Sequence, residues 1–123
     1  MKTALILFAH GARDPEWSAP MRHIQKLVRT SQPDAEVDLA FLEFMSPTLT
    51  ECVASRVAAG ARKIAVVPMF IAQGGHLKHE LPEMMAQLRS TYPTVEFSLT
   101  GPIGQEEKVM QAMAAAVLDI AGL

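Results

Sequence analysis

Cysteine is nearly absent from this chain, because Cys52 is the only one among 123 residues. An intrachain disulfide, a zinc ribbon and a CxxC redox pair are therefore all excluded. We expect a protein of the reducing cytoplasm. No apolar run approaches the roughly 18 residues of a membrane helix, so we expect no membrane partner. The apolar residues 3–9 lead into a polar segment without a small-residue cleavage site, which favours a buried strand over a signal peptide.

An excess of basic residues is missing as well. The chain has 11 Lys and Arg residues against 13 Asp and Glu residues, a net charge of −2. Proteins that bind nucleic acid normally carry a basic stripe or excess, so we expect no nucleic-acid partner. A GxxxxGK loop, a GxGxxG turn after the first apolar run and a GxSxG elbow are all absent from the sequence. We therefore expect no organic cofactor.

The hydrophobic pattern predicts an α/β fold. Half of the residues are hydrophobic, enough for the core of one domain over residues 1–123. Short apolar runs alternate with longer segments of helical period, which is typical of βα units that build a parallel sheet. The predicted fold is a single (βα)₄ domain, a four-stranded parallel sheet flanked by helices. Strands are expected at 3–9, 36–44, 63–70 and 95–99, and helices at 16–30, from Pro47 to about Gly60, at 82–90 and at 105–121.

Three residues that can bind metals or move protons lie at the ends of three successive predicted strands: His10, Glu43 and His76. In open parallel sheets, ligands bind beyond the carboxyl ends of the strands. A lone histidine there is more often a hydrogen-bonded structural residue, and Glu43 could merely cap a helix. Each histidine, however, adjoins glycine, which allows close approach of the backbone to a ligand. Those glycines are Gly11, Gly74 and Gly75.

Other polar residues give weaker signals. Arg13 and Lys78 flank the two histidines and form a local positive rim that would suit an acidic substrate. We interpret His79 as a solvated residue of a first helical turn and His23 as a surface residue. Most of the eight methionines fall on apolar stripes, which favours core packing over metal binding. By the same argument Trp17 is expected in the core.

Three segments together resemble a known family. LILFAHGARDP, FLEFMSPTL and VVPMFIAQGGHLKHELP are similar, in order and spacing, to the signature segments of the short CbiX-type cobaltochelatases. These class II chelatases insert a divalent metal into sirohydrochlorin, and close relatives use nickel or iron. The resemblance covers nearly the whole chain. It implies a four-stranded parallel sheet with the first and third strands adjacent, and a homodimer of chains that each form half of the two-lobed enzyme.

The resemblance also implies roles for individual residues. His10 and His76 match the metal-binding and catalytic histidines of the family, and Glu43 matches an acidic residue near the metal. Gly11, Gly74, Gly75, Arg13 and Lys78 are the expected substrate-binding residues. Ala12 stands where many relatives have serine, so a hydroxyl is missing there. The metal, most often Co²⁺ with Ni²⁺ or Fe²⁺ as alternatives, is expected as a substrate rather than as a resident cofactor.

Charge balance suggests how such a site works. Insertion of a divalent ion into the free macrocycle releases two pyrrole protons, so the site must hold the metal and also accept protons. An imidazole with an ordinary pKa near ~6.5 can do either around neutral pH. We expect neutral His10 and His76 to deliver the metal while Glu43 binds it or carries protons away.

Two other hypotheses remain open from the sequence. His10-Gly11 after a first strand is similar to the start of a histidine phosphatase, although that motif requires arginine before the histidine, where this chain has Ala9. The chain could also bind metal or tetrapyrrole without catalysis. Turnover separates an enzyme from a carrier, since a carrier transfers its cargo only stoichiometrically.

Overall fold

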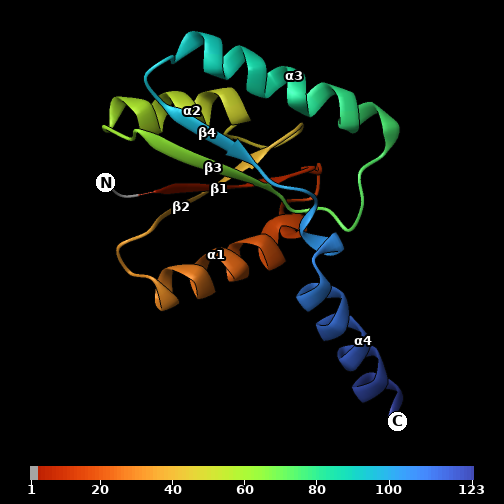
Figure 1. The fold of residues 1–123 in the computed structure, drawn as a ribbon. Helices are drawn as coiled ribbons and strands as arrows, with labels where there is room; N and C mark the ends of the chain where they lie inside the picture. The colour runs from red at the N-terminus through yellow and green to blue at the C-terminus, as the bar shows by residue number, and fades with distance from the viewer. Residues whose placement is uncertain (1–2) are drawn as a thin grey trace.

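A computed structural model describes residues 3–123 and shows one parallel sheet with helices on both faces (Figure 1). The strands lie in the order β2-β1-β3-β4, and all three strand pairs are parallel. The predicted α/β class and the adjacency of the first and third strands are confirmed. The elements are β1 (Ala4–Ala9), a 3₁₀ turn η1 (Pro15–Ser18), α1 (Ala19–Ser31), β2 (Glu36–Phe41), α2 (Leu49–Ala58), β3 (Lys63–Pro68), α3 (Gly75–Thr91), β4 (Glu96–Leu99), a 3₁₀ turn η2 (Ile103–Gln105) and α4 (Glu107–Ala121).

Two apolar layers hold the sheet between its helices. Helices α2 and α3 cover one face and α1 covers the other (Figure 1). Ile6 and Phe8 of β1 point into the layer under α2 and α3, whereas Leu7 and Ala9 point into the layer under α1. Successive side chains of a strand point to opposite faces. The continuous apolar run of β1 therefore fills both layers, as expected of a central parallel strand.

Several predicted boundaries were wrong by a few residues. Strand β2 ends at Phe41, so Glu43 lies in the following loop. Helix α2 begins at Leu49 and is capped by Thr48, rather than opening at Ser46-Pro47. The Thr48 hydroxyl accepts from the Glu51 N–H at 3.2 Å, and the Glu51 carboxylate accepts from the Thr48 N–H at 2.9 Å. This reciprocal pair is a capping box, which satisfies two amides that the helix leaves free.

Helix α3 begins at Gly75, seven residues before the predicted start at Pro82. The glycine pair Gly74-Gly75 predicts irregular structure over residues 71–77, which left about Pro82 as the expected start, and that prediction was wrong. In the structure Pro82 instead lies inside the helix. Leu77 and Leu81, both buried, anchor the first turns of α3 against the sheet. Burial of these side chains offsets the hydrogen bond that Pro82 cannot donate.

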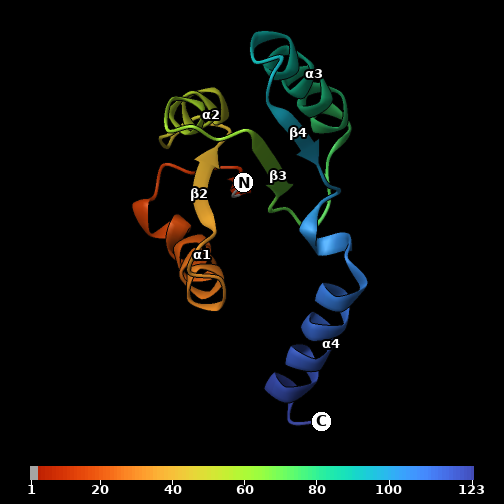
Figure 2. The ribbon, with the colours of Figure 1, turned by 60° about the vertical axis from the view of Figure 1, so that its left-hand side comes forward.

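Helix α4 points away from the rest of the molecule in both views (Figures 1 and 2). Its apolar positions lie in solvent rather than in the core. Met113, Val117 and Ile120 are 43%, 64% and 88% exposed.

Trp17, expected in the core, is 40% exposed as well. No helix formed by residues 3–123, α4 included, has the length and hydropathy that a bilayer span requires.

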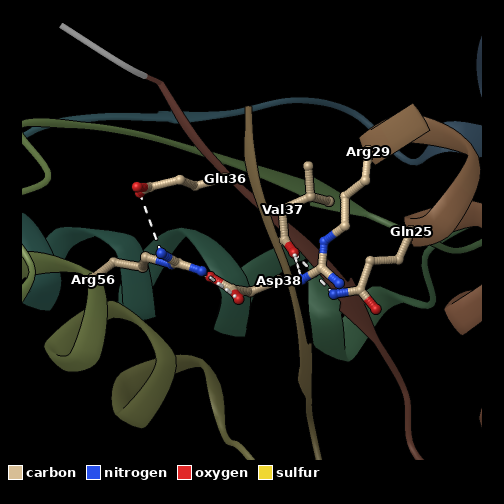
Figure 3. Close-up of polar contacts among 6 residues, drawn as sticks. All are labelled: Gln25, Arg29, Glu36, Val37, Asp38 and Arg56. Carbon is tan, nitrogen blue, oxygen red and sulfur yellow. Dashed lines mark hydrogen bonds and ion pairs between the residues drawn. The ribbon is translucent and has the colours of Figure 1, made fainter. Parts of the chain in front are cut away.

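Side chains from the helices donate to one backbone carbonyl on each edge of the sheet. At the β2 edge, Gln25 Nε2 and Arg29 Nη2 of α1 donate to the Val37 carbonyl oxygen at 2.8 and 2.7 Å (Figure 3). At the β4 edge, Arg89 Nη2 of α3 donates to the Phe97 carbonyl oxygen at 3.4 Å. Each of these carbonyls points away from the neighbouring strand, because backbone groups of a strand alternate between its two sides.

An ion-pair cluster joins β2 to α2. Arg56 pairs with Asp38 through two nitrogens and with Glu36 at 3.2 Å (Figure 3). The hydrogen bond to Asp38 raises the pKa of Arg56 above its usual value. Nearby, burial and then the charge of Asp38 raise the pKa of Cys52 to about 11. The Cys52 thiol is therefore neutral at physiological pH and lacks the thiolate that a metal ligand or nucleophile needs. Cys52 is a free thiol, and the cytoplasmic location expected from this single cysteine stays a prediction.

Candidate functional site

One cavity of about 460 Å³ lies at the carboxyl edge of the sheet and brings the three predicted strand-end residues together. His10 follows β1, Glu43 follows β2, and His76 lies at the start of α3 after β3. Because β1 lies between β2 and β3, the loops after all three strands converge here. The lining residues are His10, Leu42, Glu43, Gly74, His76, Leu77 and Glu80.

His10 lies against an aromatic stack. Its ring centroid is 5.5 Å from that of Phe70, with the planes inclined by 59°. Phe70 in turn packs edge-on against the buried Phe8 at 6.1 Å. The imidazole is thus fixed on its inner side by the core, while His10 itself remains exposed. Because His10 lines the cavity and is exposed, its imidazole keeps access to an ion or a proton.

Gly11 allows the loops that carry His10 and Glu43 to touch. The Glu43 N–H donates to the His10 carbonyl oxygen at 3.1 Å. Gly11 has a φ of 87°, and a Cβ added there would lie 1.9 Å from the Glu43 carbonyl oxygen. Only glycine satisfies both conditions, since it adopts positive φ freely and has no Cβ. Gly11 was expected to bind substrate. In the structure its role is to let the loops of His10 and Glu43 approach each other.

Replacing Gly11 with alanine is expected to lower the free energy of unfolding by about 2 to 4 kcal/mol, through backbone strain and overpacking. Urea denaturation measures this loss. Gly101→Ala is the matched control, because a Cβ there meets nothing within 4 Å. It should change stability by no more than about 0.5 kcal/mol. Equal stability of the two variants would contradict the role assigned to Gly11.

His76 contacts a carboxylate that the sequence analysis missed. Its Nε2 lies 2.9 Å from Glu80 Oε2, one helical turn further along α3. The i, i+4 spacing was visible in the sequence, but the helix was expected to begin only near His79 to Pro82, which left His76 outside it. The two groups lie at ion-pair distance, which places a carboxylate beside one ring nitrogen of His76. Glu80 also lines the cavity, so it is a fourth candidate residue beside the three strand-end residues.

The candidate ligands line one cavity, but their side chains are not arranged to coordinate one ion. Within residues 3–123, no three His, Cys, Asp or Glu side chains are arranged closely enough to hold one metal ion. The His76 side chain is 90% exposed, so few contacts restrain its rotation. These side chains would have to move before His10, Glu43 and His76 could coordinate one ion together.

The 3₁₀ turn η2 packs against the loop that precedes α3. The Gly104 N–H donates to the Phe70 carbonyl oxygen at 2.9 Å, and a Cβ at Gly104 would lie 2.3 Å from the Ile71 Cα. This close backbone contact fixes the chain as it leaves β3. Ile71 itself is 68% exposed, so the loop presents an apolar side chain at the same edge of the sheet as His76.

The predicted positive rim does not line the cavity. Arg13 is exposed, and its guanidinium lies 4.9 Å from the ring centroid of Phe44. Lys78 and Gly75 belong to the first turn of α3, and both are exposed. Of the predicted glycines after β3, only Gly74 lines the cavity. Arg13 and Lys78 could meet only the outer parts of a ligand larger than this cavity.

A second cavity, of about 310 Å³, lies beside β2 between α1 and α2. Its walls include Arg22, Cys52 and the paired Asp38 and Arg56. None of the three predicted strand-end residues contributes to it. The chemistry predicted from the sequence is therefore confined to the carboxyl edge of the sheet.

Solved structures share this architecture. The CbiX protein of Marinobacter aquaeolei VT8, described as a putative cobalamin biosynthesis protein, matches with a TM-score of 0.85 and 28% identity over 98% of both chains. The sirohydrochlorin chelatase SirB of Bacillus subtilis subspecies spizizenii, solved in complex with cobalt, matches with a TM-score of 0.81 and 31% identity. That match covers 98% of this chain and 52% of SirB.

Curated relatives give the same picture. The sirohydrochlorin ferrochelatase of Bacillus subtilis strain 168 is 31% identical over 98% of this chain and 46% of its own length. The sirohydrochlorin cobaltochelatase of Saccharolobus solfataricus is 30% identical over 92% of this chain and 91% of its own length. The chain thus spans about half of the Bacillus relatives and nearly all of the archaeal one. The CbiX family model matches residues 4–120, and the chain belongs to the CbiX family.

Proposed function

We propose that this chain inserts a divalent metal ion into sirohydrochlorin. The observation that carries the proposal is the cavity shared by His10, Glu43 and His76, in a chain that belongs to the CbiX family. Two imidazoles and a carboxylate are suited to borderline divalent ions such as Co²⁺, Ni²⁺ and Fe²⁺. The family match favours this hypothesis over a histidine phosphatase.

In the proposed mechanism the ion and the protons move in opposite directions. His10 and His76 hold the ion through neutral imidazole nitrogens, with Glu43 as the third ligand. As the ion enters the macrocycle, two pyrrole nitrogens lose their protons, and the imidazoles released by the ion become free to accept them. Glu43 passes protons towards solvent, to which it is exposed. Arg13 and Lys78 meet the acidic side chains of the macrocycle.

Metal binding in this scheme draws the ligands together. His76 swings towards His10 and Glu43 from its position beside Glu80, whose Oε2 lies 2.9 Å from His76 Nε2. The exposed position of His76 permits the movement. Glu80 then either moves with His76 or loses its contact with it. The Glu80 carboxylate is a second candidate for accepting a pyrrole proton. We place Glu80 beside the three predicted residues in the working site for this reason.

The metal that we propose first is Co²⁺. The Saccharolobus relative, which this chain matches over nearly its whole length, is named a cobaltochelatase, whereas the Bacillus relative is named a ferrochelatase. SirB structures have been solved both with cobalt and with Fe³⁺. Nitrogen and oxygen ligands do not by themselves select among these ions. Ni²⁺ and Fe²⁺ therefore belong in the same experiment.

We propose that the working enzyme is a homodimer. The Bacillus relatives are about twice the length of this chain, so a second copy would supply the missing half. Helix α4 leaves an apolar stripe exposed, with Met113, Val117 and Ile120 on one face. Contiguous exposed apolar surface of this kind marks an interaction site. The macrocycle is wider than a cavity of about 460 Å³ can enclose, and a second subunit would complete the cleft.

The test mixes the purified protein with metal-free sirohydrochlorin and with Co²⁺, Ni²⁺ or Fe²⁺ in turn. The visible spectrum of the macrocycle reports metal insertion. We expect many turnovers per chain with at least one ion, at a rate well above that of the mixture without protein. A single equivalent of product per chain would indicate a carrier, and no acceleration with any ion would refute the chelatase proposal.

A further inference from the structure

Phe44 has an unusual backbone for its residue type. Among residues 3–123 it is the only residue other than glycine with a positive φ, at 65°. A side chain disfavours this left-handed region, and aromatic residues are especially rare there. Such strain persists only where the surroundings impose it, and it concentrates at ligand sites. Folding alone would favour glycine or asparagine at this position.

The side chain of Phe44 adds nothing to the core. It is 58% exposed and belongs to neither of the two buried clusters that hold the sheet. The guanidinium of Arg13 lies over its ring, 4.9 Å from the ring centroid. A cation over an aromatic face is attracted to the ring and restricts its orientation. Arg13 thus helps to fix an aromatic ring that the rest of the fold leaves in solvent.

The strand order places Phe44 across the site from a second exposed apolar residue. Phe44 lies in the loop after β2, next to Glu43, and Ile71 lies in the loop after β3. Because β1 lies between these strands, the two loops flank His10 on opposite sides. A flat ligand centred above His10 would therefore extend towards Phe44 on one side and Ile71 on the other.

We propose that Phe44 is a substrate-binding residue whose ring packs against the tetrapyrrole, with Arg13 holding the ring and meeting an acidic side chain of the macrocycle. This inference rests on the proposed function. Aromatic rings bind flat conjugated systems through offset stacking and edge contacts, which also bury apolar area. The strained backbone turns the ring outward, and binding of the macrocycle is the benefit that offsets the strain.

The test compares Phe44→Gly with the wild type in two measurements. Titration of metal-free sirohydrochlorin, followed by its visible absorption, gives the dissociation constant, and thermal unfolding gives stability. We expect Phe44→Gly to weaken binding about tenfold, as loss of an aromatic contact does. Its unfolding midpoint should equal or exceed that of the wild type, since glycine relieves the strain. Phe44→Tyr, which keeps the ring, should bind as the wild type does.

Two controls separate the possible explanations. Leu27→Ala removes an exposed side chain of similar size from α1 and should change neither measurement. Calorimetric titration with Co²⁺ alone should give the same result for Phe44→Gly and the wild type. Unchanged macrocycle affinity in Phe44→Gly would overturn the inference while leaving the proposed function intact. So would parallel losses of stability and binding, which indicate a structural role. A wild type that binds no sirohydrochlorin would overturn both proposals.

Discussion

Replacement of His76 by alanine is expected to abolish metal insertion, lowering the rate by about a thousandfold or more. The variant loses one imidazole that binds the ion and accepts a proton, and no neighbouring side chain can replace both roles. The fold should be unaffected because the His76 side chain is 90% exposed. The visible spectrum of sirohydrochlorin measures the rate, and circular dichroism with thermal unfolding checks the fold.

His79→Ala is the matched control for this variant. His79 is an exposed histidine of the same helix, three residues further along, and lies outside the cavity. It should insert metal at the wild-type rate. Near-normal turnover by the His76 variant would refute its role in the proposed mechanism. Equal losses in both variants would point to a general effect of charge or helix structure rather than to a specific ligand.

Val117→Asp is expected to convert a homodimer into monomers and to reduce metal insertion about a hundredfold or more. A carboxylate in the centre of an apolar interface must be desolvated without a partner, which costs several kcal/mol. Val117 is 64% exposed within one chain, so the variant should unfold at the same temperature as an isolated wild-type subunit. Sedimentation equilibrium measures the mass, which for the wild type should be twice 13.4 kDa.

Ala115→Asp tests whether the face of the helix matters. Position 115 lies on the side of α4 opposite to Val117, because the two positions are 200° apart around a helix at 100° per residue. The same charge should leave both mass and activity unchanged there. A monomeric wild type with full activity would contradict the dimer proposal. Dissociation by both variants would show that charge, rather than a specific apolar stripe, controls association.

The sequence predicts the fold of this chain well, because its strands are nearly continuous apolar runs. Residues 3–9 and 63–70 could be recognised as buried strands, and polar residues at their ends could be assigned to one edge by the parallel topology. The cavity that His10, Glu43 and His76 share follows from that reasoning. The geometry of individual contacts did not follow, because it depends on where each loop ends and each helix begins.

Two gaps between prediction and structure have identifiable physical causes. The start of α3 was placed at about Pro82 because the pair Gly74-Gly75 normally marks irregular structure, and that choice concealed the contact of His76 with Glu80. The stripe of Val109, Met113, Val117 and Ile120 predicts an apolar helix face correctly. Periodicity cannot say what covers such a face, however. In α4 the described chain provides no cover, and only three-dimensional structure reveals this.

The capped edges of the sheet restrict how copies of this chain can meet. Gln25, Arg29 and Arg89 occupy carbonyl groups that another strand would need for pairing. Open strand edges are the usual template for fibrous aggregation, and protected edges suppress it. At these two positions a further strand would have to displace side-chain donors before it could pair with the sheet. In the proposed homodimer, copies of the chain therefore meet through helical surfaces. A contact of this kind between two copies uses the same surface on both, so the assembly ends at a fixed number of subunits.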